Sequence, residues 1–305
     1  MKILVTGGAG YKGITLVKYF LERGDEVTIL DNFMYGYDSI LHIISNPKLS
    51  IIQLDIRNIN ASVLAKYDVV YHLAGISGMP ACAANPDSAE AINVEATRKM
   101  TSLIQKSQLL IYASTTSFYG ASGEGCDETV ATQPVSIYGR TKYEAEKIVM
   151  QKENSIALRF ATVYGTAPRM RNDLLVNDFT YKAIHERSIV LFAGRSKRTF
   201  IHIEDAIGAY AFALDNTKTM VNNIYNVGDE TLNFSKIDIA NAIHQYVDFE
   251  IVNSSLPDLD VRNFLVSFEK IRKAGYKTKR SLDDGIKDLI KLYRFYKVYS
   301  HYNII

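Results

Sequence analysis

The chain has 305 residues, of which 47% are hydrophobic and 22% are charged, and this balance excludes a disordered chain. Its 35 basic and 33 acidic residues leave a net charge of +2, so charge gives no reason to expect binding to nucleic acid or to a membrane. Two cysteines, Cys82 and Cys126, are too few for a disulfide framework or a usual zinc site, and no cysteine or carboxylate cluster accompanies the six histidines, so we expect no metal. Because an apolar segment begins at Lys2 with no signal peptide before it, we expect a cytoplasmic protein.

The first 32 residues have the pattern of a nucleotide-binding β-α-β unit. An apolar run is followed by Gly7, Gly10 and Gly13, then by a helical stretch and a second apolar run that ends at Asp31. Glycines spaced in this way allow a tight turn, close approach of the backbone to a diphosphate and close packing of the helix on the sheet. A carboxylate about 20 residues later accepts hydrogen bonds from an adenosine ribose and repels a 2′-phosphate. We therefore predict NAD, rather than NADP, as a cofactor.

Apolar segments that alternate with helical segments predict an α/β fold with a Rossmann-type, doubly wound parallel sheet. Beyond about residue 165 the alternation loosens. We therefore predict an NAD-binding Rossmann domain over 1–165 and a smaller substrate-binding lobe over 166–305, interwoven with the first and separated from it by a cleft. The expected strands of the sheet span 2–6, 26–30, 50–54, 68–73, 109–113 and 155–160, and the lobe should contain a helix near 173–187, a strand at 189–192 and a helix from residue 204.

Tyr138 and Lys142 place a phenol and an ammonium four residues apart, on one face of a helix whose start is marked by Ser136. A cation beside a tyrosine favours the phenolate, so the pair can act as a general base. In a chain with 20 tyrosines, such a pair is by itself more often a surface feature. The hydroxyl-rich segment 112–120 favours catalysis, because it follows the apolar strand 109–113 at the edge where open α/β sheets bind ligands.

With these features the chain resembles the extended branch of the short-chain dehydrogenase/reductase superfamily, the NAD-dependent nucleotide-sugar epimerases and dehydratases. The resemblance runs over nearly the whole length of the chain. It is carried by the glycine triplet, Asp31-Asn32, Asp55-Ile56, His72-Leu73-Ala74, Asn93, Ser114-Thr115, Tyr138, Lys142, Leu158-Arg159-Phe160 and the segment 198–203.

The resemblance implies a role for each matching residue. Tyr138 takes a proton from a sugar hydroxyl, usually at C4, while hydride passes from the same carbon to NAD. Thr115 hydrogen-bonds the reacting oxygen with Ser114 beside it, and Lys142 holds the cofactor's ribose. The full set of expected cofactor-binding residues is Gly7, Gly10, Tyr11, Lys12, Gly13, Asp31, Asn32, Asp55, Ile56, Leu73, Ala74, Ser114, Tyr138 and Lys142.

Five further side chains are expected at the site, each with a simpler alternative. Arg198 matches the family's pyrophosphate-binding arginine, although a solvated arginine is as common. Lys12 stands where the family usually has an aliphatic residue, so it either extends out of the helix or touches a phosphate. The segment 168–179 resembles a subset that includes GDP-heptose C4 dehydrogenases. In it, two arginines, Arg169 and Arg171, and Asn177 are expected to hold the nucleotide diphosphate, and a capped helix with solvated arginines is the alternative.

Two departures from the family's patterns narrow the reaction. Thr116-Ser117 stands where dehydratases carry an Asp-Glu pair, so elimination of water is not expected. Galactose-type epimerases usually have an Asn soon after the Arg-Tyr-Phe strand, and here Ala161-Thr162 follows Phe160, which argues against a simple UDP-glucose 4-epimerase. His72 ends a buried strand and is expected to be a core imidazole.

We therefore predict NAD-dependent oxidation at C4 of a nucleotide-sugar, with return of the hydride to give an epimer. A C4 dehydrogenase that releases a 4-keto sugar shares every residue named above. A non-catalytic, NAD-sensing protein on the same fold is the alternative of another class, and reduction of a keto sugar with NADPH is disfavoured by Asp31. The expected partners are a nucleotide-diphosphate sugar and, by the same resemblance, a second copy of the chain in a homodimer.

Overall fold

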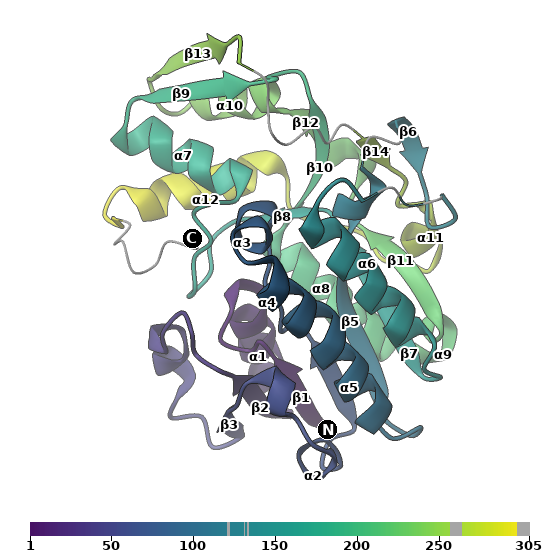
Figure 1. The fold of residues 1–305 in the computed structure, drawn as a ribbon. Helices are drawn as coiled ribbons and strands as arrows, with labels where there is room; N and C mark the ends of the chain where they lie inside the picture. The colour runs from purple at the N-terminus through teal and green to yellow at the C-terminus, as the bar shows by residue number, and fades with distance from the viewer. Residues whose placement is uncertain (121–122, 131, 133, 257–263, 298–305) are drawn as a thin grey trace.

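The computed structural model describes residues 1–120, 123–130, 132, 134–256 and 264–297. These residues form a parallel sheet of seven strands in the order β11-β7-β5-β4-β1-β2-β3 (Figure 1). Six strands lie within two residues of their predicted bounds, and the predicted doubly wound α/β fold is confirmed. The strands are β1 (Lys2–Thr6), β2 (Glu26–Asp31), β3 (Leu49–Gln53), β4 (Val69–His72), β5 (Leu109–Thr115), β7 (Ser155–Phe160) and β11 (Asn223–Val227).

Successive side chains of each strand point to opposite faces of the sheet, so both faces carry apolar side chains. Helices therefore cover both faces and form a core on each. On β1, Ile3 and Val5 belong to the core beneath α1 and α8, whereas Leu4 belongs to the core beneath α5 and α6. All three side chains are completely buried. The covering helices are α1 (Tyr11–Arg23), α8 (Ile203–Asp215), α5 (Ala96–Leu103) and α6 (Ile137–Met150).

The seventh strand, β11, is the part of the sheet that the sequence did not predict. It pairs with β7, from Asn223 beside Ile156 to Val227 beside Phe160. Both β11 and α8 come after residue 165, so the chain returns to the sheet after it has begun the lobe. The lobe is therefore interwoven with the sheet, and the division of the chain at residue 165 stays a prediction.

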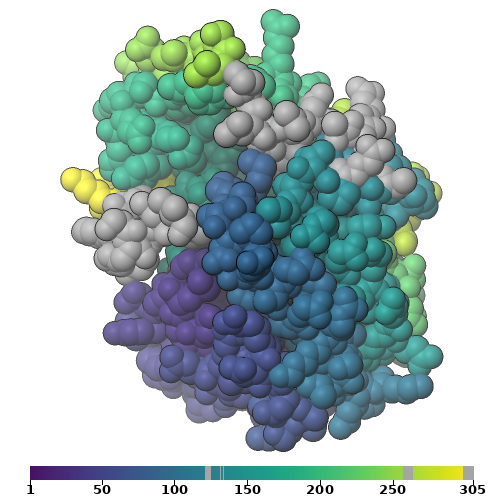
Figure 2. Space-filling model, viewed as in Figure 1, coloured from purple at the N-terminus to yellow at the C-terminus, as the bar shows by residue number. Residues whose placement is uncertain are grey.

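A smaller lobe packs around its own hydrophobic core at the carboxyl edge of the sheet. In Figure 1 it stands above the sheet, and Figure 2 shows its green surface above the purple and blue surface of the first strands and helices. Its elements are β8 (Thr162–Tyr164), α7 (Leu175–His185), β9 (Ser188–Phe192), β10 (Lys197–His202), β12 (Asn233–Ser235), α10 (Lys236–His244), β13 (Glu250–Ser254) and α12 (Leu282–Tyr293).

Within the described residues, no helix is both long and apolar enough to cross a membrane. Shorter elements complete this part of the chain. A π-helical turn, η3 (Ala91–Glu95), runs into α5. The remaining short elements are η1 (Asp38–Ile43), η2 (Ile56–Asn58), α2 (Ala61–Leu64), α3 (Met79–Ala84), α4 (Pro86–Glu90), η4 (Thr116–Tyr119), β6 (Gly123–Cys126), α9 (Thr217–Met220), η5 (Glu230–Leu232), β14 (Phe264–Val266) and α11 (Glu269–Lys273).

Two glycines let the start of α1 lie against the sheet. A Cβ atom on Gly13 would lie 2.1 Å from the carbonyl oxygen of Gly7, so no other residue fits there. Gly7 has a φ of +70°, and a Cβ atom on it would lie 2.7 Å from the backbone nitrogen of Ala74. The predicted close packing of helix on sheet therefore exists.

A buried ion pair joins β7 to α6. The guanidinium of Arg159 donates to both carboxylate oxygens of Glu146, the shortest contact being 2.7 Å, and both residues are at most 3% exposed. Burial acts to lower the pKa of Arg159, but the hydrogen bonds and charge of Glu146 outweigh it and raise the pKa. The arginine therefore stays charged in the core.

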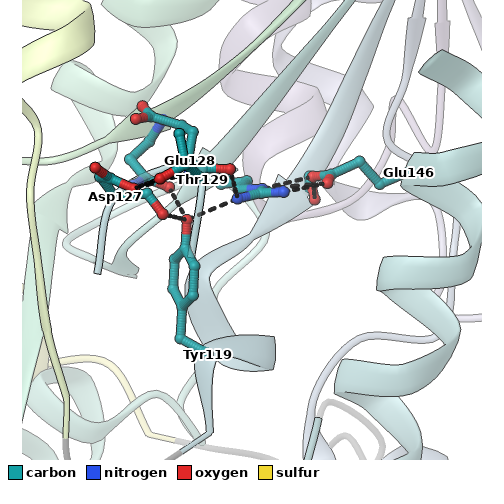
Figure 3. A network of polar contacts seen from close by, with 8 residues as sticks. Tyr119, Asp127, Glu128, Thr129 and Glu146 are labelled. Atoms are coloured by element: carbon teal, nitrogen blue, oxygen red, sulfur yellow. Dashed lines mark hydrogen bonds and ion pairs between the residues drawn. The ribbon is translucent and has the colours of Figure 1, made fainter. Parts of the chain in front are cut away.

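The same guanidinium is linked to a further strand through Tyr119. Figure 3 shows Tyr119 and Glu146 within this network of polar contacts. The guanidinium of Arg159 donates to the Tyr119 hydroxyl at 2.7 Å. The single proton of that hydroxyl is within reach of two acceptors, the side-chain oxygen of Asn226 on β11 at 2.8 Å and the backbone oxygen of Asp127 at 3.0 Å. The hydroxyl of Ser114 at the end of β5 donates to Glu146 at 2.6 Å. One buried network thus connects β5, β7, β11 and α6.

We expect Glu146→Gln to destabilise the protein by about 3–5 kcal/mol, because it leaves the charge of Arg159 buried without its counter-ion. Urea denaturation measures the free energy of unfolding. The control is Glu144→Gln on the same helix, which removes the exposed pair with Lys147 and should cost less than about 1 kcal/mol. Equal losses for the two variants would contradict the structural role of the buried pair.

Candidate functional site

Two adjoining cavities open at the carboxyl edge of the sheet, where β1 and β4 are neighbours and the strand order reverses. The first has a volume of about 1030 Å³ and is lined by residues that follow β1, β2, β3 and β4. The second has a volume of about 1560 Å³ and lies between β5, α6 and the lobe. The residues that line both cavities are Tyr11, Lys12, Ser77 and Arg171.

The first cavity collects most of the residues that the sequence predicts for the cofactor. The predicted residues among its lining are Gly7, Gly10, Tyr11, Lys12, Gly13, Asp31, Asn32, Asp55, Ile56, Leu73 and Ala74. No side chain caps the start of α1 at Gly10, so the helix N-terminus stays free to meet a phosphate. The glycine cradle and the uncapped helix start fit a dinucleotide diphosphate.

Two carboxylates in this cavity are held in place by hydrogen bonds. Asp31 accepts from the backbone nitrogens of Ala9 at 3.0 Å and Phe33 at 2.9 Å, which act against the rise in its pKa that burial causes. Hydrogen bonds from Arg57 lower the pKa of Asp55 to about 2, so Asp55 is ionised at neutral pH. Both can therefore accept hydrogen bonds from a nucleoside.

The second cavity brings together three of the predicted catalytic and cofactor residues, Ser114, Thr115 and Tyr138. Thr115 ends β5, and its hydroxyl donates to Ser117 at 3.0 Å and accepts from the backbone nitrogen of Ser117. Ser114 already donates to Glu146, so toward the cavity it can only accept. Tyr138 lies in the first turn of α6, behind the N-cap Ser136, which accepts from the backbone of that turn.

Asn93, in the π-helical turn η3, joins the loop after β4 to helix α6 through its side-chain amide. Its side-chain oxygen accepts from the backbone nitrogen of Ile76 at 2.8 Å, and its nitrogen donates to the backbone oxygen of Ile76 and to the hydroxyl of Thr141. The loop that carries Ser77 is thereby tied to the helix that carries Tyr138.

Lys142 is buried and does not line either cavity. Its Nζ atom lies 4.1 Å from the centroid of the Tyr112 ring, a distance typical of a cation–π contact. Burial, and then the charge of Lys12, lowers the pKa of Lys142 to about 7. His72 lies in the same region, completely buried between the hydroxyls of Thr6 and Thr97 at 2.8 Å each, which agrees with its predicted place in the core.

Lys12 reaches the junction of the two cavities. Its Nζ atom lies 4.3 Å from the centroid of Phe160 and 5.9 Å from that of Tyr210. Burial, and then the charge of Arg171, lowers its pKa to about 7. The side chain therefore turns inward over two rings and does not extend out of the helix into solvent.

The expected substrate-binding residues occupy different places. Arg171 lines both cavities and is paired with Asp173 through two contacts of 2.7 and 2.6 Å, and Arg198 lines the second cavity at the edge of β10. Asn177 is completely buried and does not line either cavity. Its amide bonds to the backbone of Gly165 and Arg171 and also acts on the hydroxyl of Tyr11, so Asn177 holds residues that border the cavities.

Arg169, the other arginine named for the segment 168–179, also lines a cavity, and the structure adds two lining residues that the sequence did not predict, Lys236 and Ser77. Arg169 lies in the first cavity, 6% exposed, with its guanidinium 5.0 Å from the ring of Tyr35. Lys236 and Ser77 line the second cavity. Ser77 could have been found, because it follows the Leu73-Ala74 motif at the end of β4, whereas Lys236 has no sequence signal that connects it to the site.

Among the described residues, no three histidine, cysteine or acidic side chains group together in a way that could hold a metal ion. The prediction of a metal-free protein stays a prediction.

Comparison with known proteins extends these observations. Residues 3–228 match the model of the NAD dependent epimerase/dehydratase family. The chain is 26% identical to UDP-glucuronic acid decarboxylase 1 of Arabidopsis thaliana, covering 96% of this chain and 70% of that protein. It is also 26% identical to CDP-paratose 2-epimerase of Salmonella typhi, covering 95% of this chain and 98% of that protein.

A solved structure shares the fold. The UDP-glucuronic acid 4-epimerase from Bacillus cereus, in complex with UDP-glucuronic acid and NAD, superposes with a TM-score of 0.85 at 25% identity, over 96% of this chain and 99% of that one. The family model covers well over half of the chain and ends at the last strand of the central sheet. The chain therefore belongs to the NAD dependent epimerase/dehydratase family, and it is an enzyme that uses NAD.

Proposed function

We propose that the enzyme oxidises C4 of a nucleotide-linked sugar to a ketone and then returns the hydride to the opposite face of the same carbon, after the ketone has turned over in the cavity, to give the epimer. The observation that carries this proposal is the meeting of the two cavities. The first has the glycine cradle and the two carboxylates that suit NAD, and the second presents Thr115 and Tyr138 beside it. NAD supplies the hydride acceptor when it is bound.

Tyr138 is the proposed general base. As the C4–H bond breaks and hydride leaves the carbon, the C4 hydroxyl must lose its proton, and the phenolate of Tyr138 accepts it. On return of the hydride the same phenol gives the proton back, so the reaction is balanced with no net oxidation. Thr115 lies at the end of β5, where its hydroxyl donates its one proton to Ser117. To donate to the reacting oxygen, this hydroxyl must turn its proton from Ser117 toward the cavity.

Elimination of water is not supported by the residues beside Thr115. The hydroxyl of Thr116 donates to the backbone oxygen of Phe160 at 3.2 Å and is buried, and Ser117 bonds to Thr115. Neither side chain is an acid or a base at neutral pH. A 4,6-dehydratase would need both at this edge.

The substrate proposed for the second cavity is a nucleotide-diphosphate sugar. Arg171, Arg198 and Lys236 give its walls positive charge, which suits a diphosphate. Relatives with UDP and CDP sugars in their names share the fold or the sequence, and the base for this chain stays open. The GDP-heptose subset, the homodimer and the cytoplasmic location stay predictions.

We expect Tyr138→Phe to lower turnover of the true substrate by at least about 100-fold while NAD binding is kept, because only the proton acceptor is removed. Steady-state kinetics and calorimetry with NAD give the two readings. Tyr143→Phe, one turn further along the same helix and outside both cavities, is the control and should keep its activity. Full activity of Tyr138→Phe would remove the proposed base.

We expect the free energy of unfolding of the natural protein to increase, relative to that of Lys142→Met, as the pH rises from 7 to 9. The pKa of Lys142 is about 7 in the folded chain, whereas the unfolded chain holds that proton up to about pH 10.4. The unfolded state therefore binds more protons in this window, and raising the pH stabilises the folded state by up to about 1.4 kcal/mol per pH unit.

Urea denaturation without NAD at pH 7, 8 and 9 measures this difference. Lys147→Met removes an exposed lysine from the same helix, and its stability difference should not change with pH. A pH-independent difference for Lys142→Met as well would show that Lys142 is not desolvated in the folded protein.

A further inference from the structure

Lys12 places a cation at the junction of the two cavities, and the proposed transfers of a proton and a hydride do not require it. It is the second residue of α1 and lines both the first and the second cavity. No carboxylate of the described residues forms an ion pair with it, and its contacts are the faces of the Phe160 and Tyr210 rings. Aromatic faces attract a cation but do not neutralise it.

The charged groups around Lys12 add to its positive field. Arg171 lines the same junction, and its own counter-ion is Asp173. Lys142 lies close enough that the charge of Lys12 lowers its pKa. Lys12 and Arg171 therefore line the junction, and Lys142 is buried nearby. The carboxylates that act on the last two are Asp173 at Arg171 and Glu146 at Lys142.

The junction is where the reacting end of the cofactor must lie. A dinucleotide with its adenosine ribose at Asp31 and its diphosphate at the cradle of Gly7 and Gly13 has its other end where the first cavity meets the second. The nicotinamide end must also lie close enough to the sugar to accept hydride from C4, the carbon whose hydroxyl faces Tyr138. This step rests on the proposed function.

The two oxidation states of the cofactor differ in charge at this end. The nicotinamide ring carries one positive charge when oxidised and none when reduced, while the diphosphate and both riboses stay the same. A fixed ammonium beside the ring therefore repels the oxidised form only. We propose that Lys12 sets the protein's preference between the two forms and shifts it toward the reduced form.

This preference would act on the first half of the reaction. A protein that binds the reduced form relatively more tightly favours removal of hydride from the sugar, and it keeps the reduced cofactor in place until the hydride is returned. Lys12 is thus proposed as a residue that tunes the oxidation step, in addition to the proton transfer by Tyr138.

The test compares the dissociation constants of NAD⁺ and NADH, measured by calorimetry without any sugar at pH 6.5, where Lys12 is mostly charged. We expect Lys12→Met to lower the ratio of the NAD⁺ constant to the NADH constant by about tenfold, the effect of one charge several ångströms away in a partly polar cavity. Lys12→Arg keeps the charge and should keep the ratio. Lys18→Met, an exposed position on the same helix, should leave both constants unchanged.

Two results would overturn the proposal. Equal weakening of both forms by Lys12→Met would assign Lys12 to the diphosphate, which the two forms share. Unchanged constants for both forms would leave Lys12 with a packing role only. Because no sugar is present, a failure of the proposed epimerase reaction would not alter this ratio, so the two proposals fail separately.

Discussion

The site depends on a buried ion pair between Arg159 and Glu146. Neither charge is stable alone in the interior, so β7 and α6 can pack together only in the arrangement that pairs them. Ser114 joins the same carboxylate and thereby fixes the end of β5 against α6. Since Thr115 follows on β5 and Tyr138 stands on α6, the pair sets how the two proposed reacting side chains face each other.

The electrostatics of the cleft follow from this packing. α6 carries Lys142 inward onto the ring of Tyr112, and α1, drawn against the sheet by its glycines, carries Lys12 onto Phe160. Burial lowers the pKa of each to about 7, helped by the charge of Arg171 at Lys12 and by the charge of Lys12 at Lys142, where Glu146 acts in the opposite direction. Each ammonium group, when it is charged, attracts negative charge that forms nearby, which suits the proposed removal of a proton and a hydride from one carbon.

The sequence predicts what is local and misses what depends on distant contacts. Six strands, the glycine cradle and Asp31 were predictable, because apolar runs and glycine spacing are read within about 30 residues. β11 was not, because its five residues include two asparagines and it joins the sheet only through β7. Asn177 looked like a ligand because polar residues near a helix start often bind anions, but its amide bonds to the buried backbone of Gly165. Lys236 reaches the cavity only through the fold of the lobe.

The proposed C4 epimerisation is tested most directly by incubating the purified protein with NAD and a panel of UDP-, GDP-, CDP- and dTDP-sugars. NADH absorbance and product mass are followed together. A C4 epimerase gives an isomer of unchanged mass with no accumulation of NADH, and this is the result that we expect. A product two hydrogens lighter, with NADH released, would contradict epimerisation in favour of a C4 dehydrogenase. A product that has lost water would contradict the reading of Thr116 and Ser117, and no turnover of any sugar would contradict the proposed substrate class.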